Sequence, residues 1–125
     1  MGATILVVDD EPALVDVLLA VLALEGYQVR GAPDGLVALA LVAQARPDLL
    51  VTDQHMPRLG GVTLITRLQA APDLGIPAIL MSAGAPPALP PLTTFLPKPF
   101  DLDHLLDVVA TLLATPGPSG VPEAQ

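Results

Sequence analysis

The segment Thr4–Asp10, with the sequence TILVVDD, decides the fold expected of this chain. Residues Thr4–Val8 are β-branched or apolar without polar alternation, which is typical of a strand buried on both faces of a sheet. The strand ends in two acids, Asp9 and Asp10, and Glu11-Pro12 then follows, where proline suits the first turn of a helix. A buried strand that ends in carboxylates and leads directly into a helix is typical of an α/β protein.

The same pattern recurs along the chain up to about residue 114. Strands are predicted at 4–8, 27–32, 48–53, 76–81 and 94–97, and helices at 12–24, from 33 or 34 to about 46, at 62–71 and at 101–114. Strands and helices that alternate in this way build a parallel sheet with helices on both faces. Because Pro97 cannot donate a ladder hydrogen bond, the last strand is expected at the sheet edge. The expected fold class is α/β, with a doubly wound five-stranded parallel sheet.

Residues 83–93 break this rhythm between the fourth and fifth predicted strands. Four of these eleven residues are prolines: Pro86, Pro87, Pro90 and Pro91. A helix of average length, about 11 residues, would not fit there together with its two loops. Each interior proline would also cost a helix about 3 kcal/mol. The segment is therefore predicted to be an extended loop.

The length of 125 residues indicates one domain with one core. We expect this domain to comprise residues 1–114. Residues 115–125, with the sequence TPGPSGVPEAQ, form a Pro/Gly/Ser-rich tail that is expected to be disordered. The sequence leaves open whether the domain stands alone or belongs to a longer chain.

Charge and composition exclude several classes of partner. The net charge of -8 argues against direct binding to nucleic acid or to an anionic membrane surface. The longest apolar stretches, at 17–24 and 36–43, are shorter than the roughly 20 residues that cross a bilayer. There is no cysteine, so disulfides and thiolate metal sites are excluded. The default expectation is a soluble cytoplasmic protein.

Polar side chains stand at the carboxyl ends of four predicted strands. Asp9 and Asp10 follow the first strand, and Asp53 ends the third. Ser82 follows the fourth strand and Lys98 the fifth. Ligands of open parallel sheets bind outside these ends, so the five side chains are expected in one crevice. Carboxylate oxygens suit Mg²⁺, which would also relieve the repulsion among the three acids.

Lys98 is the only lysine of the chain, which argues against a general surface role. It is expected to pair with Asp53 or with a phosphoryl oxygen. A carboxylate can act as the nucleophile in phosphoryl transfer, while a metal ion and a cation neutralise the transferring group. The same residues therefore indicate phosphate chemistry.

Four stretches together resemble the motifs of response-regulator receiver domains. They are TILVVDDEP at 4–12, LLVTDQHMP at 49–57, ILMSA at 79–83 and FLPKPF at 95–100. The resemblance covers about residues 4–114. It implies a flavodoxin-like sheet of strand order 2-1-3-4-5, in which the Pro-rich loop shortens or replaces the family's fourth helix.

The resemblance also implies a two-component switch. Asp53 matches the phosphoacceptor, and Lys98 matches the cation that pairs with the phosphoryl group. Ser82 matches the switch hydroxyl, which moves to the phosphoryl group and leaves space for the switch aromatic, Phe95, to turn inward. The implied donor is a sensor histidine kinase or phosphotransfer protein, and the downstream partner is unknown.

The implied cofactor is Mg²⁺, and four residues match its ligands. Asp10 matches the direct ligand and Asp9 its more indirect acidic neighbour. Asp53 and the backbone carbonyl of His55 complete the set. Lys98-Pro99 resembles the family's cis peptide, which X-Pro bonds form at low cost.

Structural roles compete with these assignments. The strand-end acids can serve as helix N-caps, Ser82 as a cap or turn residue, and Phe95 as plain core. Gly60 stands where the family usually has an Asp, which is expected to loosen the following turn. The missing fourth helix leads us to expect that partner binding relies on the last helix and the fifth strand.

Two other functions remain as alternatives. The first is a receiver-like interaction module (a pseudo-receiver) that signals by binding alone, with the Pro-rich loop as its working surface. The second is a phosphatase or phosphotransferase that resembles haloacid dehalogenases. Those enzymes place a second Asp two residues after the nucleophile, where this chain has His55, and no cap domain is present to hold a substrate.

Overall fold

The computed structural model describes residues 2–70 and 75–114. Its five strands form one sheet in which all neighbouring strands are parallel, in the order β2-β1-β3-β4-β5. The strands are β1 (Thr4–Val8), β2 (Gln28–Ala32), β3 (Leu49–Asp53), β4 (Ala78–Ser82) and β5 (Thr93–Pro97). The helices are α1 (Pro12–Leu24), α2 (Gly35–Gln44), α3 (Gly61–Gln69) and α4 (Leu102–Ala114). The predicted fold class and strand order are confirmed; the predicted tail at 115–125 lies outside the described residues.

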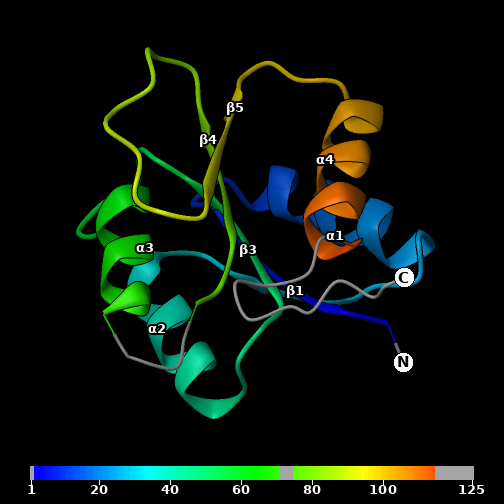
Figure 1. The fold of residues 1–125 in the computed structure, drawn as a ribbon, viewed down its shortest axis with the longest axis horizontal. Helices are drawn as coiled ribbons and strands as arrows, with labels where there is room; N and C mark the ends of the chain where they lie inside the picture. The colour runs from blue at the N-terminus through cyan, green and yellow to red at the C-terminus, as the bar shows by residue number, and fades with distance from the viewer. Residues whose placement is uncertain (1, 71–74, 115–125) are drawn as a thin grey trace, which may run out of the picture.

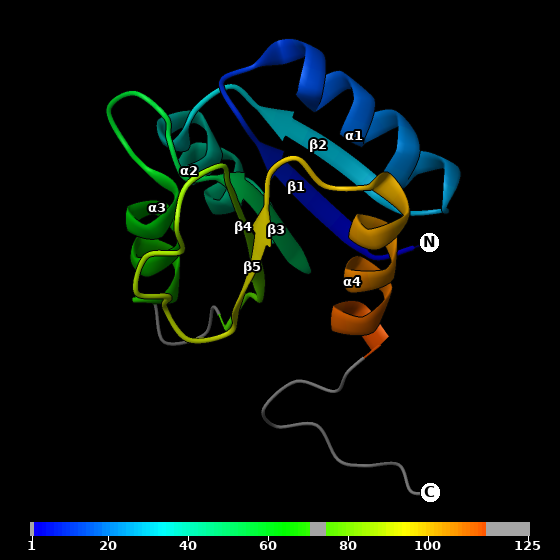
Figure 2. The same cartoon turned by 90° about the horizontal axis from the view of Figure 1, so that it is seen from above.

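The sheet is the middle layer of three (Figure 1). Helices α2 and α3 cover one face, and α1 and α4 cover the other, as the view from above shows (Figure 2). Successive strand residues contribute to opposite cores, because side chains alternate along a strand. Leu6 and Val8 belong to the core beneath α2 and α3, whereas Ile5 and Val7 belong to the core beneath α1 and α4.

The helix boundaries follow from local chemistry. Pro12 stands in the first turn of α1, and the chain turns beyond the helix at Gly26, whose φ of 98° is open to glycine. Helix α2 is capped by Asp34, whose carboxylate accepts a hydrogen bond from the Val37 N–H at 2.9 Å. The observed elements begin and end within about two residues of the predicted positions.

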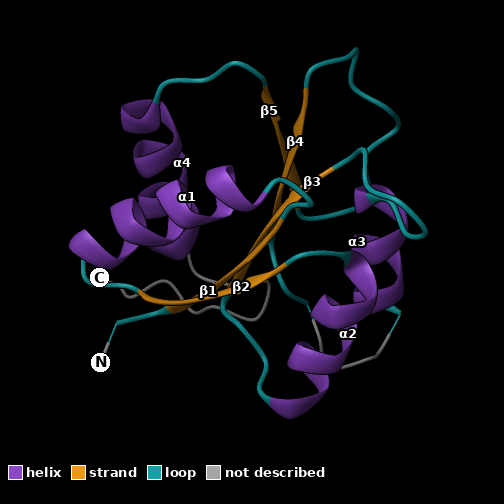
Figure 3. Cartoon of the chain, turned by 180° about the vertical axis from the view of Figure 1, so that it is seen from behind, coloured by secondary structure: helices purple, strands orange, loops and turns teal. Residues whose placement is uncertain are grey.

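The segment between β4 and β5 contains no helix, as predicted from its prolines. It leaves the top of β4 and passes on the α3 side of the sheet before it reaches the start of β5 (Figure 3). Strand β5 lies at the edge of the sheet, as Pro97 indicated. Within the described ranges, none of the helices has the length and apolarity required to cross a bilayer.

Gly61, the first residue of α3, permits a close approach between this helix and β3. A Cβ atom at this position would lie 2.5 Å from the backbone oxygen of Asp53 and 2.5 Å from Leu80 Cδ1. The first of these neighbours is backbone and cannot rotate away. Glycine at this position therefore holds the start of α3 directly against the end of the strand that carries Asp53.

We expect Gly61→Ala to lower the free energy of unfolding by about 1–3 kcal/mol, the usual cost of overpacking. Chemical denaturation followed by circular dichroism would measure it. Gly75→Ala is the matched control, because among the described residues a Cβ there meets only Leu92 Cδ1, at an ordinary 3.8 Å. Equal stability of the two variants would contradict the close-approach role of Gly61.

Candidate functional site

The carboxyl ends of the central strands bring the predicted site residues to one edge of the sheet. Asp53 is the last residue of β3 and pairs in register with Met81, one residue before Ser82. Ser82 in turn is opposite Pro97, one residue before Lys98. Asp9 directly follows β1, and its N–H donates to the Ala32 carbonyl oxygen. The parallel register therefore fixes the order in which these side chains follow one another along the edge.

Three carboxylates meet at this edge. One oxygen each from Asp9, Asp10 and Asp53 lies within 4.8 Å of the others. Asp9 and Asp53 are buried, with exposed fractions of 2% and 6%, whereas Asp10 is exposed. Like charges at this distance repel strongly in a partly buried site, so the cluster requires compensating positive charge.

Lys98 supplies part of that charge. Its Nζ lies 2.9 Å from Asp53 Oδ1 and 3.3 Å from Asp9 Oδ2. The contact with Asp53 was expected from the sequence, whereas the contact with Asp9 was not. The Lys98–Pro99 peptide is cis in the structure, as the family resemblance implied.

The pKa values of Asp9 and Lys98 are both raised, but for different reasons. Burial raises the pKa of Asp9, and the hydrogen bond from the Glu11 N–H (2.9 Å) and the nearby Lys98 charge only partly offset it. Burial alone would lower the pKa of Lys98. Its contacts with Asp53 and Asp9 outweigh burial and raise that pKa, so Lys98 remains an ammonium at neutral pH.

The donor set fits Mg²⁺. Mg²⁺ is a hard cation that prefers oxygen ligands, above all carboxylates. Three acids at this edge each offer one carboxylate oxygen, and these oxygens lie within 4.8 Å of one another. The exposed Asp10 leaves the site open to solvent, as expected of a Mg²⁺ site that keeps several waters.

Ser82 and Phe95 lie on the neighbouring strands β4 and β5. Ser82 is buried, and its Oγ accepts a hydrogen bond from the Gly84 N–H at 3.2 Å. Phe95 is half-buried and packs against the core beneath α2 and α3. His55 is exposed in the loop that follows β3, two residues after Asp53.

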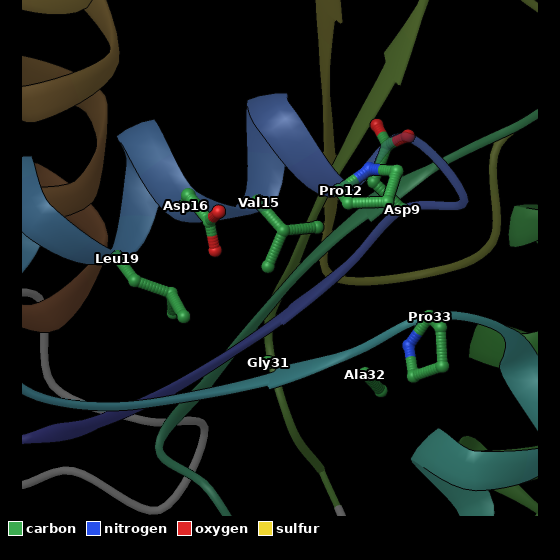
Figure 4. A pocket seen from close by; sticks show the side chains of 8 residues that line it. All are labelled: Asp9, Pro12, Val15, Asp16, Leu19, Gly31, Ala32 and Pro33. Carbon is green, nitrogen blue, oxygen red and sulfur yellow. The ribbon is translucent and has the colours of Figure 1, made fainter.

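Asp9 also stands at the end of an apolar groove between α1 and β2, with a volume of about 290 Å³. Val15 and Leu19 point from α1 toward Gly31 on β2, while the Asp9 carboxylate points away from this apolar part (Figure 4). A Cβ on Gly31 would lie 2.8 Å from Val15 Cγ1. This close packing places the start of α1, and the acids before it, over the sheet.

A second groove, of about 460 Å³, opens between α1 and the turn from β5 to α4. Lys98 and Glu11 are its charged lining residues, and apolar side chains such as Leu14, Val17 and Phe100 form much of the rest. Lys98, which lines this groove, also contacts Asp53 and so links the groove to the acidic cluster.

Residues 5–110 match the sequence pattern of the response regulator receiver domain family. The chain belongs to this family. Receiver domains are the phosphoacceptor modules of two-component signalling. The match covers β1 through most of α4, and therefore includes every strand end described above.

Curated relatives and solved structures agree with this assignment. The response regulator MprA of Mycobacterium sp. (strain KMS) is 36% identical over an alignment 130 residues long. The alignment covers 99% of this chain and 56% of the relative. The chain thus spans about half the length of the curated relatives it matches. A receiver domain of a histidine kinase from Syntrophus aciditrophicus is 29% identical, with a TM-score of 0.85 over 99% of this chain and 98% of that one.

Two further solved receiver domains come from histidine kinases. That of the hybrid histidine kinase CckA is 33% identical, with a TM-score of 0.78 over 88% of this chain and 98% of that one. That of the sensor histidine kinase PA1611 of Pseudomonas aeruginosa PAO1 is 26% identical, with a TM-score of 0.81 over 92% of this chain and all of that one. The PA1611 structure holds a magnesium ion in its active site cleft.

Gln54, the residue after the candidate phosphoacceptor, has a role that the sequence analysis missed. Gly60, the N-cap of α3, makes no side-chain cap. Instead the Gln54 side-chain oxygen accepts a hydrogen bond from the Val62 N–H at 2.9 Å, and its backbone oxygen accepts from the Gly61 N–H at 3.1 Å. The turn is therefore held from the β3 side by Gln54 rather than by a side chain at position 60.

We expect Gln54→Ala to lower the free energy of unfolding by about 0.5–2 kcal/mol, the usual cost of losing an N-cap. Urea denaturation would measure the change. The matched control is Gln44→Ala, which truncates an exposed glutamine at the end of α2 and should stay within about 0.5 kcal/mol of the parent chain. A Gln54 effect no larger than that of Gln44 would remove the capping role.

Proposed function

We propose that this receiver domain is a Mg²⁺-dependent switch that accepts a phosphoryl group on Asp53. One observation carries the proposal: Lys98 Nζ bridges Asp53 and Asp9 beside a third carboxylate, Asp10, at the open edge of the sheet. A structural ion pair needs one acid for one base. Three acids around one lysine leave negative charge that a divalent ion can balance.

The side chains suit an in-line transfer to a carboxylate. An Asp53 oxygen attacks the phosphorus atom, a new P–O bond forms, and the bond between phosphorus and the donor breaks. Lys98, already 2.9 Å from Asp53 Oδ1, is placed to pair with a phosphoryl oxygen as negative charge develops. When bound by Asp9, Asp10, Asp53 and the His55 carbonyl, Mg²⁺ would neutralise charge on the transferring group.

The response to phosphorylation would start at Ser82. Its hydroxyl now accepts the Gly84 N–H and would leave that contact to donate to a phosphoryl oxygen. Phe95, half-buried on the neighbouring strand, would then turn further inward into the space that Ser82 leaves. Both changes would reach the surface at the segment after β4 and along β5.

The donor would be a phosphohistidine of a cytoplasmic histidine kinase or phosphotransfer protein. Such a side chain would dock in the groove that Lys98, Glu11 and Phe100 line, because Lys98 also contacts Asp53. Its volume of about 460 Å³ exceeds that of one imidazole, so the rest of the groove is available to other donor side chains.

The two alternatives have less support. A binding module without phosphate chemistry would not need three acids gathered around one lysine. A hydrolase acting on external phosphoesters would need an acid two residues after the nucleophile, where the exposed His55 stands. Failure to hydrolyse a panel of phosphomonoesters would dispose of the hydrolase.

The test is phosphorylation by acetyl phosphate, followed by intact mass, with Mg²⁺ or with EDTA. We expect a labile adduct of one phosphoryl group that requires Mg²⁺. It should be absent in Asp53→Asn, because an amide cannot form the acyl phosphate, and present in the matched control Asp107→Asn, which changes an exposed acid on α4. An adduct that persists in Asp53→Asn, or that forms equally well in EDTA, contradicts the proposal.

A further inference from the structure

The segment Ala85–Pro91 has little conformational choice. Its four prolines have φ locked near −65°. Each residue that precedes a proline is pushed toward extended or polyproline II backbone. Ala88 is the only residue of this segment that is neither a proline nor followed by one. The structure shows no helix, strand or turn from Ala85 to Pro90.

Burial along this segment repeats every three residues, the period of a polyproline II helix. Pro87 and Pro90 are half-buried against the domain, whereas Pro86, Ala88 and Leu89 between and beside them are exposed. In a polyproline II backbone this pattern places one edge against the protein and two edges in solvent. Leu89 is 40% exposed, and Leu92 after the segment is 45% exposed.

Both ends of the segment are anchored. The Gly84 N–H donates to Ser82 Oγ at its start. At its end, the Pro91 carbonyl oxygen accepts from the Gln69 side chain of α3 and from the Thr93 hydroxyl. Between these anchors, Ala85–Pro90 take part in none of the hydrogen bonds found among the described residues. Their carbonyl oxygens are free to accept bonds from another molecule.

The electrostatic character of this region is unusual for the chain. Residues 75–97 contain no charged side chain, although the whole chain has a net charge of -8. A partner that bound through charge complementarity would find no ionic partner along this segment. The binding surface of a partner is therefore expected to be uncharged where it meets this segment. It would also have to fit a polyproline II backbone of three residues per turn.

We propose that Ala85–Pro90 is a recognition segment for a protein domain with an aromatic-lined groove that binds polyproline II. Such grooves accept the apolar edges of the helix between flat rings, while ring N–H and O–H groups donate to the free carbonyls. Pro86 and Leu89 lie three residues apart on one exposed edge and would fill adjacent parts of the groove. The segment is already ordered by its anchors, so little conformational entropy is lost on binding.

This inference does not depend on phosphorylation of Asp53, because it uses the segment as it stands in the structure. Its failure would leave the phosphoacceptor function untouched. It adds a site on the segment between β4 and β5 to the surface expected from the sequence, the last helix and the fifth strand.

The test uses the full ¹⁵N-labelled chain and three unlabelled probes, an SH3, a WW and an EVH1 domain, all with aromatic grooves for polyproline II. We expect at least one probe to shift the amide resonances of Ala85, Ala88 and Leu89. The double substitution Pro86→Ser with Leu89→Ser should weaken that binding about tenfold or more, equivalent to about 1.4 kcal/mol. Both residues are exposed, so the rest of the spectrum should be unchanged.

Leu24→Ser is the matched control, since it removes a leucine that is 86% exposed at the end of α1. It should bind the same probe as tightly as the parent chain. Three outcomes would overturn the proposal: no probe shifts these amides, the double variant binds unchanged, or Leu24→Ser loses binding equally. Concentration-dependent shifts of the same amides without any probe would also overturn it, because the segment would then bind a second copy of this chain.

Discussion

The contact of Lys98 with two carboxylates is the constraint around which the site is built. Its ammonium lies between Asp53 and Asp9, which end adjacent strands, and Asp10 adds a third acid at the same edge. No single strand could gather these groups. They meet because the sheet is parallel and all its carboxyl ends face the same way. Apolar packing of the strands therefore holds the three carboxylates close together, although their like charges repel one another.

Much of this could be predicted from the sequence because it depends on local pattern and topology. Apolar strands without alternation imply a parallel sheet, and Asp9, Asp53 and Lys98 follow such strands directly. The sequence did not reveal the role of Gln54 or the close contact at Gly61. Both depend on how near α3 approaches β3, a distance that only the folded structure defines. The sequence did contain one indication of the role of Gln54. Gly60 has no side chain with which to cap α3, so another residue had to do so.

The proline content of the segment between β4 and β5 changes its local structure without changing the sheet. Prolines prevent a helix there, yet the sheet, the acids and Lys98 remain in place because β5 still pairs with β4 along its whole length. Gly84, directly before Ala85, donates its N–H to the Ser82 hydroxyl, so one hydrogen bond links this surface to the strand end that carries Ser82. A change at one is therefore positioned to reach the other through Ser82.

The central claim is that the three acids form a site for a divalent cation, and thermal unfolding with and without Mg²⁺ tests it most directly. At Mg²⁺ concentrations about 100-fold above Kd, binding should stabilise the chain by about 2.7 kcal/mol and raise Tm. Asp10→Asn should raise Tm without Mg²⁺, because it relieves repulsion, and should lose most of the response to Mg²⁺; Asp107→Asn should keep that response. An equal response in Asp10→Asn, or one that NaCl of the same ionic strength reproduces, would contradict the account.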